Sequence, residues 1–124
     1  MSYNIGIETL SGKGAGTMTI TPSAALMDAI VLSVVARDGT YGYKITQDIR
    51  AVMEISESTL YPVLRRLQRD GCLEVHDQEF AGRNRRYYRI TPKGRELLQQ
   101  SLEAWAGFKS RLDRIFYATE EEKL

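Results

Sequence analysis

The chain has 124 residues, with 43% hydrophobic and 27% charged side chains and a formal net charge of +1, which fits one soluble globular domain. Its longest apolar run, residues 29–36, is too short to span a bilayer, and the N-terminus shows no secretory signal, so we expect a cytoplasmic protein and not a membrane protein. A single cysteine, Cys72, excludes an internal disulfide and a cysteine-based zinc site.

Residues 1–20 show little hydrophobic periodicity and have a glycine-rich centre at residues 12–16. Such a composition is typical of a terminal extension that packs against nothing. We interpret the stretch as a flexible N-terminal arm, which is either a native extension or a remnant of an expression tag.

Two short helices are predicted after the arm. The first follows a capping residue, Thr21 or Ser23, and runs to Arg37 with apolar residues at helical spacing. These are Leu26, Ala29, Ile30, Val34 and Val35. The second begins near residues 41–43, and its apolar face consists of Ile45, Ile49, Val52 and Met53. A break of about three or four residues leads to the next helix, which is the arrangement of a helix-turn-helix.

The third helix, about residues 58–70, has two opposite faces. Its apolar stripe, which must be buried, consists of Leu60, Val63, Leu64 and Leu67. The opposite face carries Ser58, Pro62, Arg65 and Arg69, with Thr59, Arg66 and Tyr61 on its flanks. Arginine can bridge a guanine edge, hydroxyls can donate to phosphates or bases, and a proline ring can contact a thymine methyl. The pattern predicts a recognition helix for the major groove, although arginines that only solvate an outer face would look the same.

The start of this helix is ambiguous, because Ser56 and Ser58 are both suitable N-cap residues. Pro62 removes a hydrogen bond when it lies inside a helix. A cap at Ser58 would place Pro62 near the first turn, so the sequence favours the later start.

A hairpin is predicted after Gly71, which suits a helix C-terminus. Residues 73–76 alternate between apolar and polar, and residues 86–90 can pair back antiparallel across a polar tip at residues 77–84. Two strands after a helix-turn-helix form a wing, here about residues 77–86. Unless the tip is only a solvated loop, its arginines suit phosphate or minor-groove contacts; they are Arg83, Arg85 and Arg86.

The charge distribution agrees with a DNA-binding middle segment. Residues 56–95 contain nine Lys or Arg and five Asp or Glu. By contrast, residues 1–55 contain four basic and five acidic residues, and residues 96–124 contain four basic and six acidic residues. Positive charge is therefore concentrated where the predicted recognition helix and wing lie, which is the footprint of a phosphate-binding face.

A long helix, residues 92–117, is predicted to begin at the capping pair Thr91 and Pro92. Its apolar stripe spans almost three heptads and consists of Leu98, Leu102, Trp105, Phe108, Leu112, Ile115 and Phe116. The rest of the domain can bury only the first turns, so we predict a homodimer with this stripe at its interface. The two-fold axis would place two recognition helices about 34 Å apart on a duplex. Residues 118–124 form an acidic tail that we expect to fray.

The segments T-L-Y-P-V-L-R-R-L (residues 59–67) and G-R-N-R-R-Y-Y-R-I-T (residues 82–91) resemble the PadR family of winged-helix transcriptional regulators, as does Y-G-Y at residues 41–43. The resemblance covers residues 24–117 and is to the small subfamily with a single C-terminal helix. It implies a dimeric repressor on a palindromic operator, with DNA contacts from Thr59, Tyr61, Pro62, Arg65, Arg83 and Arg85. The N-terminal stretch and Gln68, where family members commonly carry an acid, depart from the pattern.

Three other functions compete with this interpretation. Some similar proteins bind flat aromatic drugs between tryptophans at the dimer centre, so Trp105 is a candidate ligand-binding residue of a multidrug or aromatic sensor coupled to DNA release. A tryptophan on a heptad stripe is, however, more commonly dimer core. An enzyme has little support, because the only histidine, His76, lacks catalytic partners. A winged helix that binds protein instead of DNA would leave the arginines without a role.

Together these observations predict a mainly α fold with a small two-stranded antiparallel wing. Residues 21–91 would form a winged helix-turn-helix DNA-binding domain and residues 92–117 a dimerisation helix. The expected partners are double-stranded DNA, a second copy of the chain and a small aromatic effector, with no catalytic residue, cofactor or metal.

Overall fold

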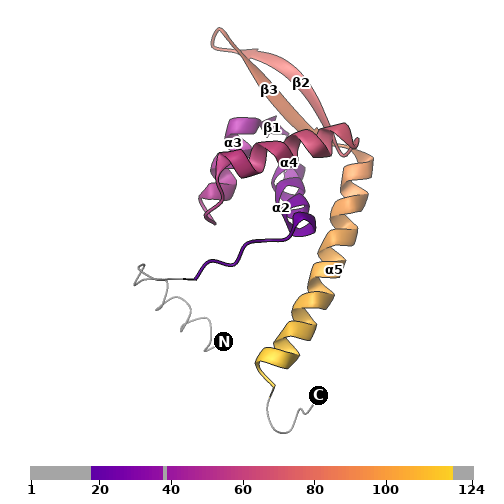
Figure 1. Ribbon diagram of the computed structural model, residues 1–124. Helices are drawn as coiled ribbons and strands as arrows, with labels where there is room; N and C mark the ends of the chain where they lie inside the picture. The colour runs from indigo at the N-terminus through magenta and orange to yellow at the C-terminus, as the bar shows by residue number, and fades with distance from the viewer. Residues whose placement is uncertain (1–17, 38, 119–124) are drawn as a thin grey trace.

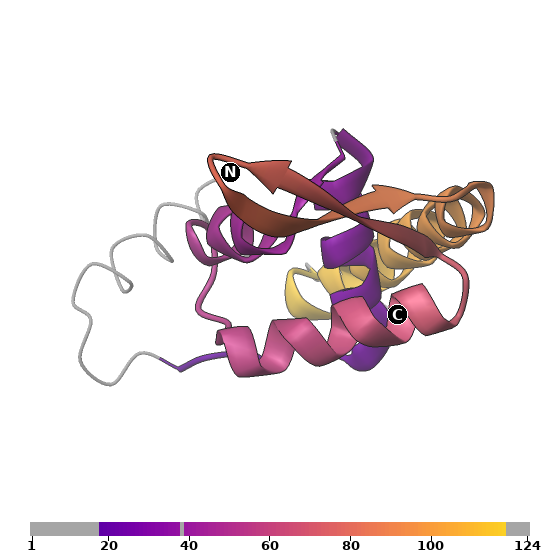
Figure 2. The ribbon, with the colours of Figure 1, turned by 90° about the horizontal axis from the view of Figure 1, so that it is seen from above.

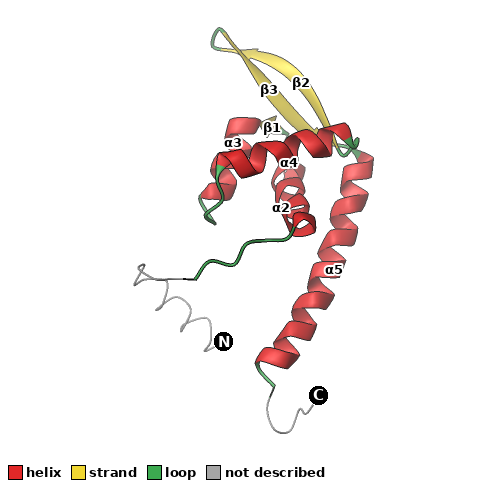
Figure 3. Cartoon of the chain, in the orientation of Figure 1, coloured by secondary structure: helices red, strands yellow, loops and turns green. Residues whose placement is uncertain are grey.

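The computed structural model describes residues 18–37 and 39–118 (Figure 1). The elements, in chain order, are α2 (Ala24–Arg37), β1 (Thr40–Tyr41), α3 (Gly42–Arg50), α4 (Glu57–Arg69), β2 (Leu73–Phe80), β3 (Arg83–Ile90) and α5 (Pro92–Phe116). Helices α2, α3 and α4 gather into one body, from which the β2–β3 hairpin and α5 extend in different directions (Figure 3). Most of the predicted N-terminal arm and acidic tail, residues 1–17 and 119–124, lies outside the described residues.

The apolar stripe of α4 is buried as predicted, and it forms the centre of the core. Leu60 and Leu64 are fully buried, as are Leu32 of α2 and Ile45 of α3. Of the predicted α2 face, Ala29 and Val35 are buried, and Ile30 and Val34 pack against the core. The buried residues also include three that were not predicted, Met27, Val31 and Leu32. This helix is apolar on most of its circumference, so spacing alone allowed more than one buried face.

Helix α3 is shorter than the sequence pattern predicted. It ends at Arg50, and Val52, predicted to lie on its apolar face, is 85% exposed. Residues 51–56 therefore connect α3 to α4, which is a longer connection than the predicted one. Ile55 and Met53 in this connection still pack against the core, so the turn is held by apolar contacts.

Helix α4 begins earlier than predicted. Its N-cap is Ser56, whose hydroxyl accepts a hydrogen bond from the backbone N–H of Thr59 at 3.3 Å. Pro62 consequently lies inside the helix, where its ring removes the usual bond to the carbonyl of Ser58. Ser58 and Pro62 are both exposed, so water can satisfy that carbonyl and the proline costs little.

The predicted antiparallel hairpin is present as β2 and β3, but the sheet contains a third strand that was not predicted, and its strand order is β1-β3-β2. Strand β1 pairs at Thr40↔Tyr88 and Tyr41↔Tyr87. Two residues are too few for a period-two pattern, so this strand has no signature in the sequence. Because β1 directly precedes α3, it joins the base of the hairpin to the helix-turn-helix.

The hairpin is also longer and more tightly turned than predicted. Strands β2 and β3 have eight residues each, and only Ala81 and Gly82 connect them. Both residues have positive φ, 53° and 80°, as a two-residue hairpin turn requires. The polar side chains predicted to form a loop at residues 77–84 therefore mostly belong to strands.

The N-terminus of α5 is attached to the C-terminus of α4. The Thr91 hydroxyl donates to the Gly71 carbonyl at 2.7 Å and accepts from the Gly94 N–H at 3.0 Å, while Lys93 Nζ donates to the Asp70 carbonyl at 2.7 Å. Gly94 is buried, and a Cβ there would overlap the Cys72 carbonyl oxygen. The capping pair predicted from sequence thus also fixes α5 against the end of α4.

Beyond its first turns α5 leaves the body of the domain. It packs against α2, and Leu97 and Leu98 contact the core, but the rest of its apolar stripe is largely uncovered. Leu112 is half-buried, and the exposed members are Leu102, Trp105, Phe108, Ile115 and Phe116, at 39–64%. None of the helices in the described part of the chain is both long and apolar enough to cross a membrane.

We expect Gly94→Ala to destabilise the protein by about 1 to 3 kcal/mol, because the added methyl group forces α5 away from the Cys72 carbonyl. Gly107→Ala is the matched control, since its Cβ would have the Arg111 guanidinium as nearest neighbour at 3.4 Å and alanine favours helix by about 1 kcal/mol. Urea unfolding of both variants measures the difference. Equal stability of the two would contradict the proposed close contact.

Candidate nucleic-acid interface

The face of α4 opposite the core is exposed to solvent. Ser58, Pro62, Arg65 and Arg69 are all exposed, whereas the stripe behind them is buried. We call these four residues the α4 front. Its composition suits a major groove, because hydroxyl and guanidinium donors surround an apolar ring that carries no donor of its own.

A groove of about 610 Å³ separates α4 from the wing; we call it the α4–wing groove. Viewed from above, α4 lies along one edge of the domain with the hairpin beside it (Figure 2). The groove brings Arg65 of α4 onto one surface with the three wing arginines. Its lining residues are Tyr41, Gly42, Tyr43, Tyr61, Arg65, Arg83, Asn84, Arg85, Arg86 and Tyr88.

The floor of the groove depends on Gly42 at the start of α3. A Cβ at this position would lie 3.2 Å from Cε1 of Tyr88 and 3.5 Å from Cε1 of Tyr61, so both rings pack closely against the glycine. Burial raises the pKa of the Tyr88 phenol, and the nearby Arg86 guanidinium acts in the opposite direction. A phenol that stays neutral adds no negative charge to a surface lined by arginines.

The guanidinium groups around the groove differ in their partners. Arg86 lies 3.8 Å from the Asp77 carboxylate across the hairpin, with both side chains more than half exposed. In residues 18–37 and 39–118, neither Arg65 nor Arg83 forms an ion pair. These two guanidiniums can therefore bind phosphates or base edges without breaking an internal contact.

Arg66, predicted to contact DNA, is instead engaged within the chain. Both of its terminal nitrogens donate to the Asp28 carboxylate of α2, Nη1 to Oδ2 at 3.1 Å, and this bonding raises the arginine pKa. The pair holds α4 to α2. Arg69 has its predicted exposed position, and its one ion pair with a described residue is a long contact of 3.6 Å with the adjacent Asp70. Sequence spacing placed Arg66 on the flank but gave no indication of its partner.

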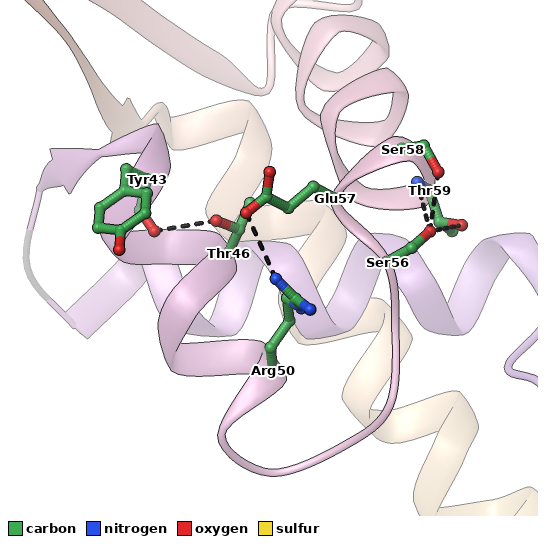
Figure 4. Close-up of polar contacts among 7 residues, drawn as sticks. All are labelled: Tyr43, Thr46, Arg50, Ser56, Glu57, Ser58 and Thr59. Atoms are coloured by element: carbon green, nitrogen blue, oxygen red, sulfur yellow. Dashed lines mark hydrogen bonds and ion pairs between the residues drawn. The ribbon is translucent and has the colours of Figure 1, made fainter.

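Polar side chains of α3 and of the N-terminus of α4 form two separate groups of contacts, and one ion pair joins the two helices (Figure 4). The Arg50 guanidinium lies 3.4 Å from the Glu57 carboxylate, and the buried Thr46 hydroxyl donates to the Tyr43 carbonyl at 2.9 Å. The Ser56 hydroxyl lies 2.9 Å from that of Ser58 and 3.0 Å from that of Thr59. Of these contacts only the Arg50–Glu57 pair joins α3 to α4; the others lie within α3 or within the first turn of α4. Neither Arg50 nor Glu57 belongs to a local motif that would predict this pair from the sequence.

Trp105 lies far along α5 beside a second, mainly apolar hollow of about 340 Å³, which we call the apolar groove. Helices α2, α3 and α5 line it, and Trp105 is 39% exposed with its ring 6.4 Å from that of Phe108. The predicted dimer residues and the candidate ligand-binding residue thus share a region, and none of them lines the α4–wing groove.

Two curated proteins are similar to the chain over most of its length. A protein of Lysinibacillus sphaericus is 34% identical over 92 residues, which is 70% of this chain and 84% of that protein. The transcriptional regulator Rv3488 of Mycobacterium tuberculosis is 39% identical over 75 residues, covering 60% of this chain and 70% of the regulator.

Solved structures show the same fold. The crystal structure of smu.1704 from Streptococcus mutans has a TM-score of 0.74 and 37% identity and covers 82% of this chain and 95% of its own. A PadR family transcription regulator from Clostridium difficile has a TM-score of 0.68 at 24% identity, covering 73% of this chain and 97% of its own. The latter likeness concerns the fold alone.

The profile of the transcriptional regulator PadR-like family matches residues 31–100, which include all of α3, α4 and the wing. This match confirms the resemblance noted in the recognition helix and wing, and it confirms that the chain is not an enzyme, because the family consists of transcription regulators. The chain belongs to the PadR-like family of DNA-binding transcriptional regulators and has its winged-helix fold with a long C-terminal helix.

Proposed function

We propose that the protein is a repressor that binds a palindromic operator as a homodimer, with the α4 front in the major groove and the wing on the adjacent backbone. The observation that supports this most strongly is the α4–wing groove, which places Arg65 and the wing arginines on one continuous surface. In this arrangement Arg65 reaches a base edge, Pro62 contacts a thymine methyl and Ser58 and Thr59 donate to phosphates.

The other residues that were predicted to contact DNA differ in where they lie and in what they contact. Tyr61 lines the groove and suits a phosphate contact through its hydroxyl, and Arg69 extends the α4 front toward its C-terminal end. Arg83 and Arg86 are exposed on the wing and suit phosphate neutralisation. Arg66 is omitted from this surface, because releasing it from Asp28 would leave a largely buried carboxylate without its partner.

The proposed dimer rests on α5. Its exposed stripe runs from Leu102 to Phe116 on a part of the helix that leaves its own domain, and it adjoins the apolar groove at Trp105. Contiguous apolar surface of this kind marks an interaction site, and a second copy offers a matching stripe. A two-fold axis through α5 would present two copies of α4 to the two halves of a palindrome.

We expect Arg65→Ala to weaken operator binding by about 1 to 3 kcal/mol without loss of stability, since the side chain is exposed and without an ion pair among the described residues. Arg114→Ala removes an equally exposed arginine from the far end of α5 and should leave affinity unchanged. The measurement is a gel-shift titration on a duplex selected from a random-sequence library. Equal affinity of both variants and the parent would rule out the α4 front as the reading surface.

We expect Ile115→Asp to dissociate the dimer, because a carboxylate buried in the seam of both chains costs several kcal/mol unless it is neutralised. Ile115 is 59% exposed in the single chain, so the domain itself should remain folded. Ser110→Asp adds the same charge to an exposed position on the opposite side of α5 and should remain dimeric. Sedimentation gives the mass of the particle in solution. A binding titration on a duplex with two half-sites should show a lower affinity for the variant, because a monomer loses the gain in effective concentration that comes from holding two recognition helices together.

A dimeric Ile115→Asp variant with parental affinity would show that the exposed stripe is not the dimer seam. Loss of dimerisation in Ser110→Asp as well would point to general unfolding of α5, which circular dichroism would reveal as lost helix.

Detection of a planar aromatic effector is a second candidate function, favoured by the apolar groove beside Trp105. Its volume of about 340 Å³ lies at the lower end of the range of small-molecule sites. Trp105 is the only tryptophan, so all tryptophan fluorescence reports on this groove. We expect a planar anionic dye such as fluorescein, which does not intercalate into DNA, to quench the emission saturably and to release the selected duplex over the same concentrations. Unsaturable quenching without effect on the duplex would exclude this function.

A further inference from the structure

The wing carries a stack of aromatic rings around one guanidinium. The Arg85 guanidinium carbon lies 4.4 Å from the ring centre of Tyr41 and 4.6 Å from that of Phe80. Both distances are well within the range of cation–π attraction. Arg85 is half-buried, whereas Arg83 and Arg86 on the same strand are exposed. The three wing arginines, which look equivalent in the sequence, therefore have different surroundings.

The register of the sheet explains why these side chains meet. Arg85 of β3 is paired with Gln78 of β2, and Phe80 lies two residues after Gln78 on β2. The side chains of all three residues are therefore on one face of the sheet. Tyr87 is on that face too and is paired with Tyr41, whose ring it meets edge-on at 5.8 Å. The stack thus runs from Phe80, next to the hairpin turn, through Arg85 to Tyr41 at the base.

Tyr41 connects this stack to the helix-turn-helix. It is the last residue of β1 and the N-cap residue of α3. Strand β1 pairs with β3 only at Tyr87 and Tyr88, so the part of the hairpin nearer the turn is a two-stranded ribbon with mostly exposed side chains. A ribbon of this kind is only marginally stable by itself. Arg85 is placed to attach the outer half of the ribbon to the start of α3.

We propose that Arg85 is a positioning residue: its guanidinium, seated between Tyr41 and Phe80, fixes the angle of the wing to α4 and so places Arg83 and Arg86 on the DNA backbone. This inference rests on the proposed use of the wing as a DNA contact. It replaces the prediction that Arg85 itself mainly neutralises a phosphate, because a guanidinium covered by two rings has less surface free for an anion.

The first test uses the free protein and needs no DNA. Three variants each remove one member of the contact between the Arg85 guanidinium and the two rings: Phe80→Leu, Tyr41→Leu and Arg85→Gln. Each variant should increase the rate of amide hydrogen exchange in residues 77–86. Arg83→Gln is the matched control, since it removes an exposed wing arginine that makes no such ring contact among the described residues. Phe80 is 54% exposed, so its replacement should not disturb folding. Unchanged exchange in all three variants would overturn the proposal.

The second test separates positioning from phosphate contact by the salt dependence of binding to the selected duplex. Arg83→Gln should lower the slope of log K against log salt by about 0.9, as expected for one lost phosphate contact. Tyr41→Leu changes no charge, yet it should weaken binding by about threefold to tenfold, because less of the free protein has the wing in the binding-competent orientation.

A double variant makes the test decisive. Tyr41→Leu combined with Arg85→Gln should bind no more weakly than the weaker single variant, because both remove the same contact. Additive losses in the double variant would overturn the proposal, because they would show two independent contacts. Parental affinity in Tyr41→Leu together with a slope lowered by about 0.9 in Arg85→Gln would show that Arg85 is a phosphate contact. If the parent protein retains no duplex at all, the proposed function fails, while the exchange measurement still decides whether Arg85 holds the wing.

Discussion

The structure depends on the burial of one side of α4. Leu60, Leu64 and Leu67 are at most 1% exposed and form the centre of a core to which α2, α3 and the base of the hairpin all contribute. These residues recur at helical spacing and so lie on one face of α4. When that face is buried, the opposite face of the helix is exposed to solvent. Arg65 and its neighbours on the α4 front are therefore presented outward by the same packing that makes the domain stable.

Polar contacts join α4 to the three other helices that the structure describes, α2, α3 and α5. The Asp28–Arg66 pair holds α4 to α2, the Arg50–Glu57 pair joins it to α3, and Thr91 ties its C-terminal end to α5. Arg66 and Glu57 are therefore charged residues of α4 that are engaged within the chain. In the proposed dimer a movement of α5 would reach α4 through the Thr91–Gly71 and Lys93–Asp70 contacts, and the proposed effector at Trp105 would act on the DNA surface by this route.

Much of this arrangement could be predicted from the sequence, because strong periodicity and caps carry the information. The stripe and front of α4, the cap at Thr91 and the uncovered length of α5 were all readable from residue spacing. The features that could not be predicted depend on residues that are far apart in the sequence. Strand β1 is too short to form a pattern, and the ion pair of Arg66 depends on Asp28, 38 residues earlier in the chain. The ring contacts of Arg85 depend equally on a strand register that no local motif specifies.

The most direct test of the account is site-specific photo-cross-linking to the selected duplex. The only cysteine, Cys72, is 3% exposed, so a photoreactive maleimide can be directed to a single introduced thiol. Ser58→Cys on the α4 front and Asn84→Cys in the α4–wing groove should both cross-link to the duplex, and Ser110→Cys on α5 should not. Cross-linking confined to Ser110→Cys would show that DNA, if bound at all, lies on a different face and would contradict the account.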